Sequence, residues 1–103
     1  MTYKEIANEF TANPRDVHTV PLDGRAPIWF YVHAEGGIVY ATPAETHKPS
    51  SRMKSPIPVK ESEFEKMLEL YHRRLDGERV FKEAWRLSRA QVYWYGIFND
   101  LGL

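Results

Sequence analysis

Cysteine is absent from this sequence, and its absence removes several classes of protein at once. Without a thiol the chain can form no disulfide, no thiolate metal site and no cysteine nucleophile. No run of about 18 apolar residues occurs, and the N-terminus is polar, so we expect neither a transmembrane helix nor a signal peptide. The formal net charge is zero, which argues against bulk electrostatic binding of nucleic acid. Together these absences predict a soluble, cytoplasmic protein without membrane association.

The composition is that of an ordinary globular domain, with 43% hydrophobic, 14% aromatic and 27% charged residues. A chain of 103 residues is long enough for one core, so we expect a single domain over residues 1–103 that folds alone or as a small oligomer. Residues 1–46 hold three basic and six acidic side chains, whereas residues 47–103 hold eleven and eight. The second part therefore carries either a basic face or a mixed solvated surface.

The first half of the chain changes from a helical to an alternating pattern. Thr2 and Glu5 match a capping box, and Asn13-Pro14 ends the helix that follows. Alternating apolar residues then predict an antiparallel meander, with Asp23-Gly24 and Gly36-Gly37 as tight turns and Pro21 confining the first strand to an edge. The expected strands are Val17–Leu22, Ala26–Ala34 and Ile38–Thr42.

The central strand of this meander has two unlike faces. One face is typical of a core and contains Ile28, Phe30, Val32 and Ala34, joined by Val39 and Ala41 of the next strand. The other face contains Trp29, Tyr31, His33 and Tyr40. Because three such rings would expose a large area, we expect this face to pack under a helix of the same chain, form a dimer interface or bind a flat ligand.

A long connection follows the meander. Residues Thr46–Val59 include three prolines, three serines and no acidic residue. This segment could hold an anion, because hydroxyls and cations supply donors with no competing carboxylate; the alternative is a mobile basic loop. The residues expected to hold the anion are His47, Lys48, Ser50, Ser51 and Arg52.

A clear helix is predicted after this connection. Ser62 and Glu65 repeat the capping-box pattern, and Asp76-Gly77 supplies a C-terminal stop after residues 64–75. The expected apolar face of this helix is Phe64, Met67, Leu68, Tyr71 and Leu75.

The last segment, residues 78–101, carries two apolar stripes. The first is Val80, Ala84, Leu87, Gln91, Trp94, Phe98 and Leu101, and the second is Phe81, Trp85, Val92 and Tyr95. We expect one stripe to face the preceding helix as an antiparallel hairpin and the other to cover the sheet or a second subunit. Ser88 and Gln91 offer a further capping box, so either one helix or two helices broken at Ser88 fit the pattern.

Signals for chemistry are few. The four histidines show no metal-ligand spacing, and no phosphate-binding or dinucleotide motif occurs, so we expect no metal, no cofactor and no catalytic residue. His33 or His47 could pair with Glu35, Glu45 or Ser50, or each could be a lone surface histidine. Residues 78–101 also look like a helix-turn-helix element, which would present Arg86, Arg89, Gln91 and Tyr93 to DNA.

The segments P-I-W-F-Y-V, G-G-I-V-Y-A, H-K-P-S-S-R, E-F-E-K-M-L-E-L-Y-H-R-R and A-Q-V-Y-W-Y-G-I-F occur in this order within residues 27–98. This combination resembles small uncharacterised bacterial proteins carried on mobile elements, such as integron gene cassettes. The resemblance implies a bacterial cytoplasmic accessory protein and brings no mechanism.

We therefore predict an α+β fold with an N-terminal helix, a three-stranded antiparallel meander and a C-terminal helical hairpin packed on one sheet face. The expected function is that of a non-catalytic interaction module acting as a homodimer, which binds a peptide or small anionic ligand between the aromatic sheet face and the basic loop. DNA binding through the C-terminal element is the alternative. The rings that favour self-association are Trp29, Tyr31, Tyr40, Trp85, Trp94 and Tyr95.

Overall fold

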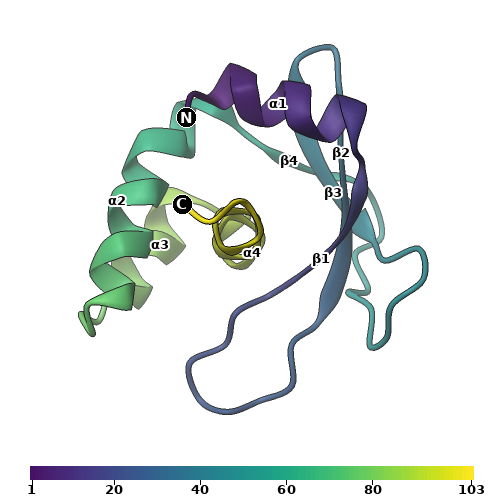
Figure 1. Cartoon of the computed structure of the whole chain (residues 1–103). Coiled ribbons are helices and arrows are strands. Elements are labelled where there is room, and N and C mark those ends of the chain that lie inside the picture. Colours follow the sequence, from purple (N-terminus) through teal and green to yellow (C-terminus); the bar gives the residue numbers. More distant parts are fainter.

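The computed structural model describes residues 1–103 and shows an α+β fold with four α-helices and one four-stranded antiparallel sheet (Figure 1). The elements are α1 (Tyr3–Ala12), β1 (Arg15–His18), β2 (Trp29–Glu35), β3 (Ile38–Pro43), β4 (Ile57–Val59), the 3₁₀ turn η1 (Glu61–Glu63), α2 (Phe64–Leu75), α3 (Phe81–Leu87) and α4 (Gln91–Leu101). None of the helices combines the length and the apolar character that crossing a bilayer requires.

The first helix forms as the sequence predicts. The Thr2 hydroxyl accepts a hydrogen bond from the Glu5 N–H, and the Glu5 carboxylate accepts one from the Thr2 N–H at 2.9 Å. This reciprocal pair satisfies two backbone donors that a helix start would otherwise leave unpaired. The helix ends at Ala12, and its C-cap residue Asn13 directly precedes Pro14. Its buried residues are Tyr3, Ile6, Ala7 and Phe10.

The sheet has the strand order β1-β2-β3-β4 and therefore one strand more than expected. The tight turn at Gly36-Gly37 is confirmed, because both residues have positive φ, 58° and 78°, between the partners Glu35 and Ile38. β4 pairs with β3 at the sheet edge, within the segment expected to be a connection. A strand of three residues with Pro58 at its centre is too short to show an alternating pattern, and only an edge tolerates that proline.

The first hairpin differs from its prediction. β1 ends at His18, and a loop of residues 19–28 replaces the tight turn expected at Asp23-Gly24. The Thr19 N–H still donates to the Ile28 carbonyl at 2.9 Å, but Pro21 has no N–H with which to extend the ladder. Consequently Ile28 lies outside β2 and is 44% exposed, so its assignment to the core is wrong.

All helices lie on one side of the sheet, with α4 beside the strands and with α2 and α3 beyond it (Figure 1). Phe30 and Val32 of β2 face this helical layer and are fully buried. Gly96 allows α4 to approach the sheet closely, since a Cβ atom there would lie 2.6 Å from the His18 carbonyl oxygen and 2.9 Å from the Phe30 ring. The single hydrophobic core therefore lies between the sheet and α1, α2 and α4.

Residues 78–101 form two helices, with the break at Ser88, where the backbone is extended. The Ser88 hydroxyl accepts from the Ala90 N–H at 2.9 Å and donates to a Glu63 carboxylate oxygen at 2.6 Å. The same oxygen accepts from the Trp94 indole N–H at 3.2 Å. The break is thus held by a tertiary network, and the capping box expected between Ser88 and Gln91 does not form.

The other helical predictions are corrected in detail. Ser62 does not cap α2, which begins at Phe64 directly after η1 and has no side-chain cap. Leu75 was expected on the apolar face of α2 but is 59% exposed. Leu70, which was not expected there, is fully buried. The first stripe of residues 78–101 is buried or half-buried as predicted. The second stripe contributes only Tyr95 to the core, because Phe81, Trp85 and Val92 are exposed.

Candidate functional site

The sheet face directed away from the helices carries the aromatic residues that the sequence assigns to it. The register pairs Asp16 with Tyr31, His18 with Trp29 and His33 with Tyr40. Directly paired residues point to the same face, so these six side chains form one surface, which we call the open face. Its four predicted members, Trp29, Tyr31, His33 and Tyr40, are half-buried. No helix covers the open face, so packing under a helix is excluded (Figure 1).

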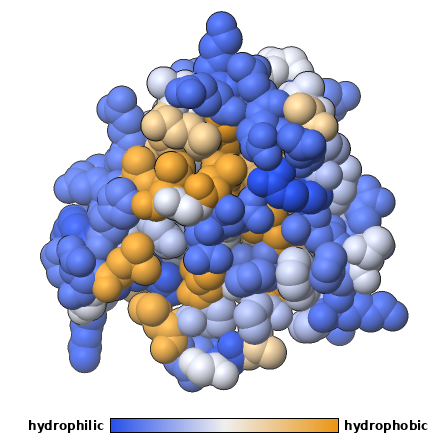
Figure 2. Space-filling view, viewed as in Figure 1, coloured by the Kyte–Doolittle hydropathy of each residue, from blue (hydrophilic) through white to orange (hydrophobic).

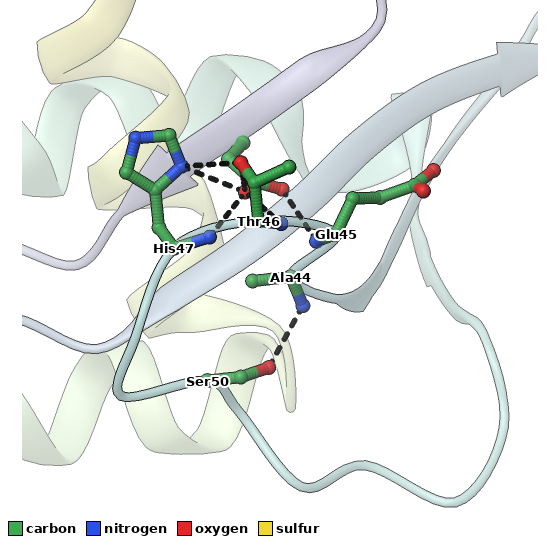
Figure 3. A network of polar contacts seen from close by, with 6 residues as sticks. Ala44, Glu45, Thr46, His47 and Ser50 are labelled. Carbon is green, nitrogen blue, oxygen red and sulfur yellow. Dashed lines mark hydrogen bonds and ion pairs between the residues drawn. The ribbon is translucent and has the colours of Figure 1, made fainter.

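The chain after β3 folds back onto this surface. The Trp29 N–H donates to the Pro49 carbonyl at 2.8 Å, and the Ser51 N–H donates to the Trp29 carbonyl at 2.8 Å. The Ser50 hydroxyl accepts from the Ala44 N–H at 2.8 Å, which closes the loop of residues 44–50 (Figure 3). The segment around Ser50 thus lies beside β2 where β3 has ended, and the loop carries His47 to the open face.

Asp16 anchors this loop. Its carboxylate accepts hydrogen bonds from the backbone N–H groups of Glu45, Thr46 and His47 at 2.9, 2.9 and 3.0 Å. It also accepts from the Thr46 hydroxyl at 3.0 Å and from the His47 ring Nδ1 at 2.8 Å. Burial opposes ionisation of Asp16, but these donors outweigh it and hold the pKa of the carboxyl group well below its usual range. The ionised Asp16 therefore acts as the organising charge of the loop.

The pairing with Asp16 fixes the protonation of one His47 nitrogen. An ionised carboxylate only accepts hydrogen bonds, so Nδ1 of His47 must carry the proton in this contact. Figure 3 shows the second ring nitrogen directed away from the Asp16 contacts. It can accept a hydrogen bond from a ligand when neutral and donate one when protonated.

An aromatic stack lies over the same contacts. The His47 ring stacks on Trp29 with 3.9 Å between centroids and 20° between planes, and His18 meets the edge of Trp29 at 5.0 Å. A cleft of about 380 Å³ opens beside these rings, where β1 meets α4. It is lined by Asp16, Val17, His18, Trp29, His47, Gly96, Asn99 and Asp100. This cleft offers a ligand both ring surface and polar atoms.

A second group of rings continues along the open face. His33 lies between Tyr31, with centroids 6.0 Å apart, and Tyr40, with centroids 5.6 Å apart. Nδ1 of His33 is buried and has no hydrogen-bond partner. Buried polar atoms without a partner are uncommon in folded proteins, so this position has a hydrogen-bonding capacity that the isolated chain does not use.

The residues expected to hold an anion have different roles. Ser50 closes the loop, and the Ser51 hydroxyl lies 2.8 Å from the Tyr93 hydroxyl, so both serines serve internal contacts. Lys48 and Arg52 are exposed and form no ion pair within the chain. Lys48, Arg52 and His47 are therefore the residues of the expected anion site that can still contact a ligand.

Sequence reasoning missed Asp16, which is the partner that His47 takes in place of Glu35, Glu45 or Ser50. Asp16 and His47 are 31 positions apart in the chain, and no local pattern signals this contact. Only the strand alternation, which places Asp16 on the same face as His18, could have indicated it.

The residues of the expected DNA-reading surface do not lie together on one exposed surface. Gln91 is buried, with 8% of its surface exposed. Tyr93 is half-buried, packs edge-on against Phe30 at 4.8 Å and contacts Ser51 through its hydroxyl. Arg86 and Arg89 are exposed. The prediction that α4 presents Gln91 to a groove is therefore wrong, because the Gln91 side chain is buried.

No group of three or more histidine, aspartate or glutamate side chains lies close enough together to hold a metal ion. The chain matches no known family model, and neither the curated proteins nor the solved structures contain a match to it. The resemblance to proteins of integron gene cassettes therefore stays a prediction.

Proposed function

We propose that this protein is a non-catalytic binding module that takes a small anionic ligand with a flat ring on its open face. The observation that carries the proposal is the stack of His47 on Trp29, 3.9 Å apart at 20°. This internal contact is a precedent for the way a planar ring binds there. Stacking on an aromatic side chain contributes about 1–3 kcal/mol in complexes with nucleic-acid bases, and it tolerates many ring types.

The loop beside the stack supplies the charge that an anion requires. Lys48 follows His47 directly, and Arg52 lies four residues further along. Neither side chain has a carboxylate partner in the chain, so an anionic ligand would not have to displace an existing ion pair. A ligand with both a ring and an anion therefore gains from two contacts, whereas a ligand with only one of them gains less.

The test separates the ring from the charge. Adenosine 5′-monophosphate, adenosine and inorganic phosphate are titrated into the full chain, and binding is followed by amide chemical shifts of residues 44–52. We expect the monophosphate to bind at least tenfold more tightly than either of the other two. Hexaglutamate, which carries charge without a ring, represents the peptide ligands that the sequence also suggests. Equal affinity for hexaglutamate and the monophosphate would overturn the requirement for a ring.

A pair of arginine variants locates the anion. Arg52→Gln should weaken binding of the monophosphate about tenfold, since it removes an unpaired cation from the loop. Arg86→Gln is the matched control, because Arg86 is also exposed but lies on α3. The same affinity in both variants would show that the loop does not bind the anion.

Self-association is a further part of the proposal. Trp94 and Tyr95 no longer support it because both belong to the core. Trp85 is 66% exposed and stacks beside Phe81, which is 71% exposed, with 6.5 Å between their ring centroids. We expect sedimentation at high micromolar concentration to give the mass of a dimer, and a monomer under these conditions would refute this part.

A further inference from the structure

A cleft larger than the one beside His47 lies away from the open face, between the loop of residues 19–28 and the helices. It has a volume of about 780 Å³ and shares no lining residue with the cleft beside His47. The loop forms one wall, and the ends of α2, α3 and α4 nearest to it form the other. Clefts of about 300–1,000 Å³ with largely apolar walls are typical binding sites for small molecules.

Half of the 18 residues that line this cleft are hydrophobic, and several of these are exposed. Leu22 is 71% exposed, Leu75 59%, Phe81 71% and Val92 46%. Figure 2 shows apolar residues between the helical layer and the loop of residues 19–28, which lies at the bottom of the view. Phe81 and Val92 belong to the second apolar stripe of residues 78–101, for which the sequence predicts a cover. Burying these side chains against an apolar ligand would remove them from water, which is favourable.

The charges at the cleft are not balanced. Asp23 pairs with Arg25 at 2.6 Å, and Glu78 pairs at 3.2 Å with Arg73. The other two cationic residues of the lining, Arg74 and Arg79, have no carboxylate partner. The cleft therefore joins apolar walls to two unpaired guanidinium groups.

Arg74 is also held in place. Its Nη2 donates to the Val20 carbonyl at 2.6 Å, and its guanidinium carbon lies 4.6 Å from the centroid of the Tyr95 ring. These contacts use one of the five guanidinium N–H donors, so others remain for a ligand. The Tyr95 hydroxyl beside it is buried without a hydrogen-bond partner.

We propose that this cleft binds a monoanionic amphiphile, with its apolar chain between Leu22, Phe81 and Val92 and its carboxylate at Arg74 and Arg79. Charge complementarity selects this ligand class. A neutral apolar molecule would leave both arginines unpaired, and a cationic amphiphile would be repelled by them. A carboxylate can accept two parallel hydrogen bonds from one guanidinium group.

The test titrates the full chain with decanoate below its micelle-forming concentration, by calorimetry and by amide chemical shifts of residues 19–28. Decyltrimethylammonium, which has the same chain length and the opposite charge, is the comparison. We expect decanoate to bind with one site and at least ten times more tightly than the cation. Equal affinity for the two, or shifts outside the cleft only, would overturn the proposal.

Two pairs of variants locate the site. Val92→Asp places a charge on the apolar wall, and its position in the first turn of α4 favours an acidic residue, so the fold is kept. It should weaken decanoate binding at least tenfold, whereas Ile38→Asp, at a similarly exposed position on β3, should not. Arg79→Gln should weaken binding of decanoate several-fold, and Arg86→Gln should leave it unchanged.

Sedimentation distinguishes the ligand from a second copy of the chain. If Val92→Asp converts a dimer of the wild-type protein to a monomer and decanoate does not bind to either, the cleft is a dimer interface and the proposal is refuted. The nucleotide titration at the open face is independent of this result, because the two clefts share no residue.

Discussion

Replacement of Asp16 by asparagine tests whether one carboxylate organises the loop that completes the open face. Four donors converge on the Oδ2 atom, two from Thr46 and two from His47, and Oδ1 accepts only from the Glu45 N–H. The asparagine oxygen can take the Oδ2 position. Its amide group then faces the Glu45 N–H, so two donors oppose each other where one hydrogen bond was lost.

The expected magnitude follows from this geometry. A hydrogen bond to a charged group contributes about 1.5–3 kcal/mol and one to a neutral group about 0.5–1.5 kcal/mol. Four weakened bonds and one lost bond could remove about 5 kcal/mol, but the exposed loop can rehydrate its donors. We therefore expect Asp16→Asn to lower the free energy of unfolding by about 3 kcal/mol, or the melting temperature by about 15 °C.

The pH dependence of the free energy of unfolding tests whether the charge of Asp16 is responsible. Because folding lowers the pKa of Asp16, its contribution is fully present above the unfolded-state pKa of about 4 and is lost as pH falls toward the folded-state value. Urea unfolding of the wild-type protein and of Asp16→Asn should differ by a constant free energy above about pH 5. The difference should shrink progressively below about pH 4.

Asp23→Asn is the matched control for this experiment. Asp23 likewise accepts from a side chain with which it forms an ion pair, that of Arg25, but the Asp23 side chain is 52% exposed. Exposed pairs contribute about 0–1 kcal/mol, so this variant should unfold nearly as the wild-type protein does. The reasoning about Asp16 is refuted if Asp16→Asn costs no more than the control, or if its cost is the same at pH 3 as at pH 7.

Three further substitutions probe the scaffold by urea unfolding. Gly96→Ala should cost about 3 kcal/mol, despite the better helix propensity of alanine, because the new methyl group would meet backbone and the Phe30 ring; an unchanged unfolding midpoint would contradict the close contact. Glu63→Ala should cost about 2–4 kcal/mol, since it leaves the proton of the Ser88 hydroxyl and the Trp94 N–H without an acceptor, and the exposed Glu65→Ala should cost little. Tyr3→Phe should cost about 2–3 kcal/mol, because its hydroxyl bridges a β3 N–H and a β4 carbonyl in the core; a loss below about 0.5 kcal/mol would show that water replaces it.

The parts of the fold that the sequence predicts correctly rest on local patterns. The Thr2–Glu5 capping box and the Gly36-Gly37 turn each depend on residues that are neighbours in the chain. The burial pattern of β2 and β3 follows from strand alternation alone, since one face packs on helices. Such features need no knowledge of distant partners, so a single sequence suffices for them.

The features that the sequence missed or left open depend on contacts between distant residues. Ser88 breaks the last helical segment because its hydroxyl reaches Glu63, 25 residues earlier, and not through a capping box. Pro58 forms an edge strand only because β3 offers it a partner. In both cases the local sequence pattern does not explain the observed structure, because tertiary contacts provide the free energy that stabilises it.

The candidate site likewise combines features that follow from local patterns with features that depend on distant contacts. Strand alternation predicts that Trp29, Tyr31, His33 and Tyr40 lie on one face. No pattern indicates that Asp16 accepts hydrogen bonds from the loop around His47. A loop of polar and proline residues has no apolar stripe with which to dock, so its position must come from hydrogen bonds. A carboxylate on the adjoining strand is the acceptor that can satisfy several N–H groups at once.

The same dependence on distant contacts explains why residues 78–101 have two different surfaces. The stripe with Val80, Ala84 and Trp94 is buried because α2 and the sheet cover it. The stripe with Phe81 and Val92 is equally apolar but faces the cleft beside the loop of residues 19–28. The apolar side chains at helical spacing therefore predicted that this second stripe would be buried. Only the position of the loop of residues 19–28 shows that the chain itself leaves the stripe exposed. An external ligand with a chain to bury and a charge for Arg79 fits the surface that remains.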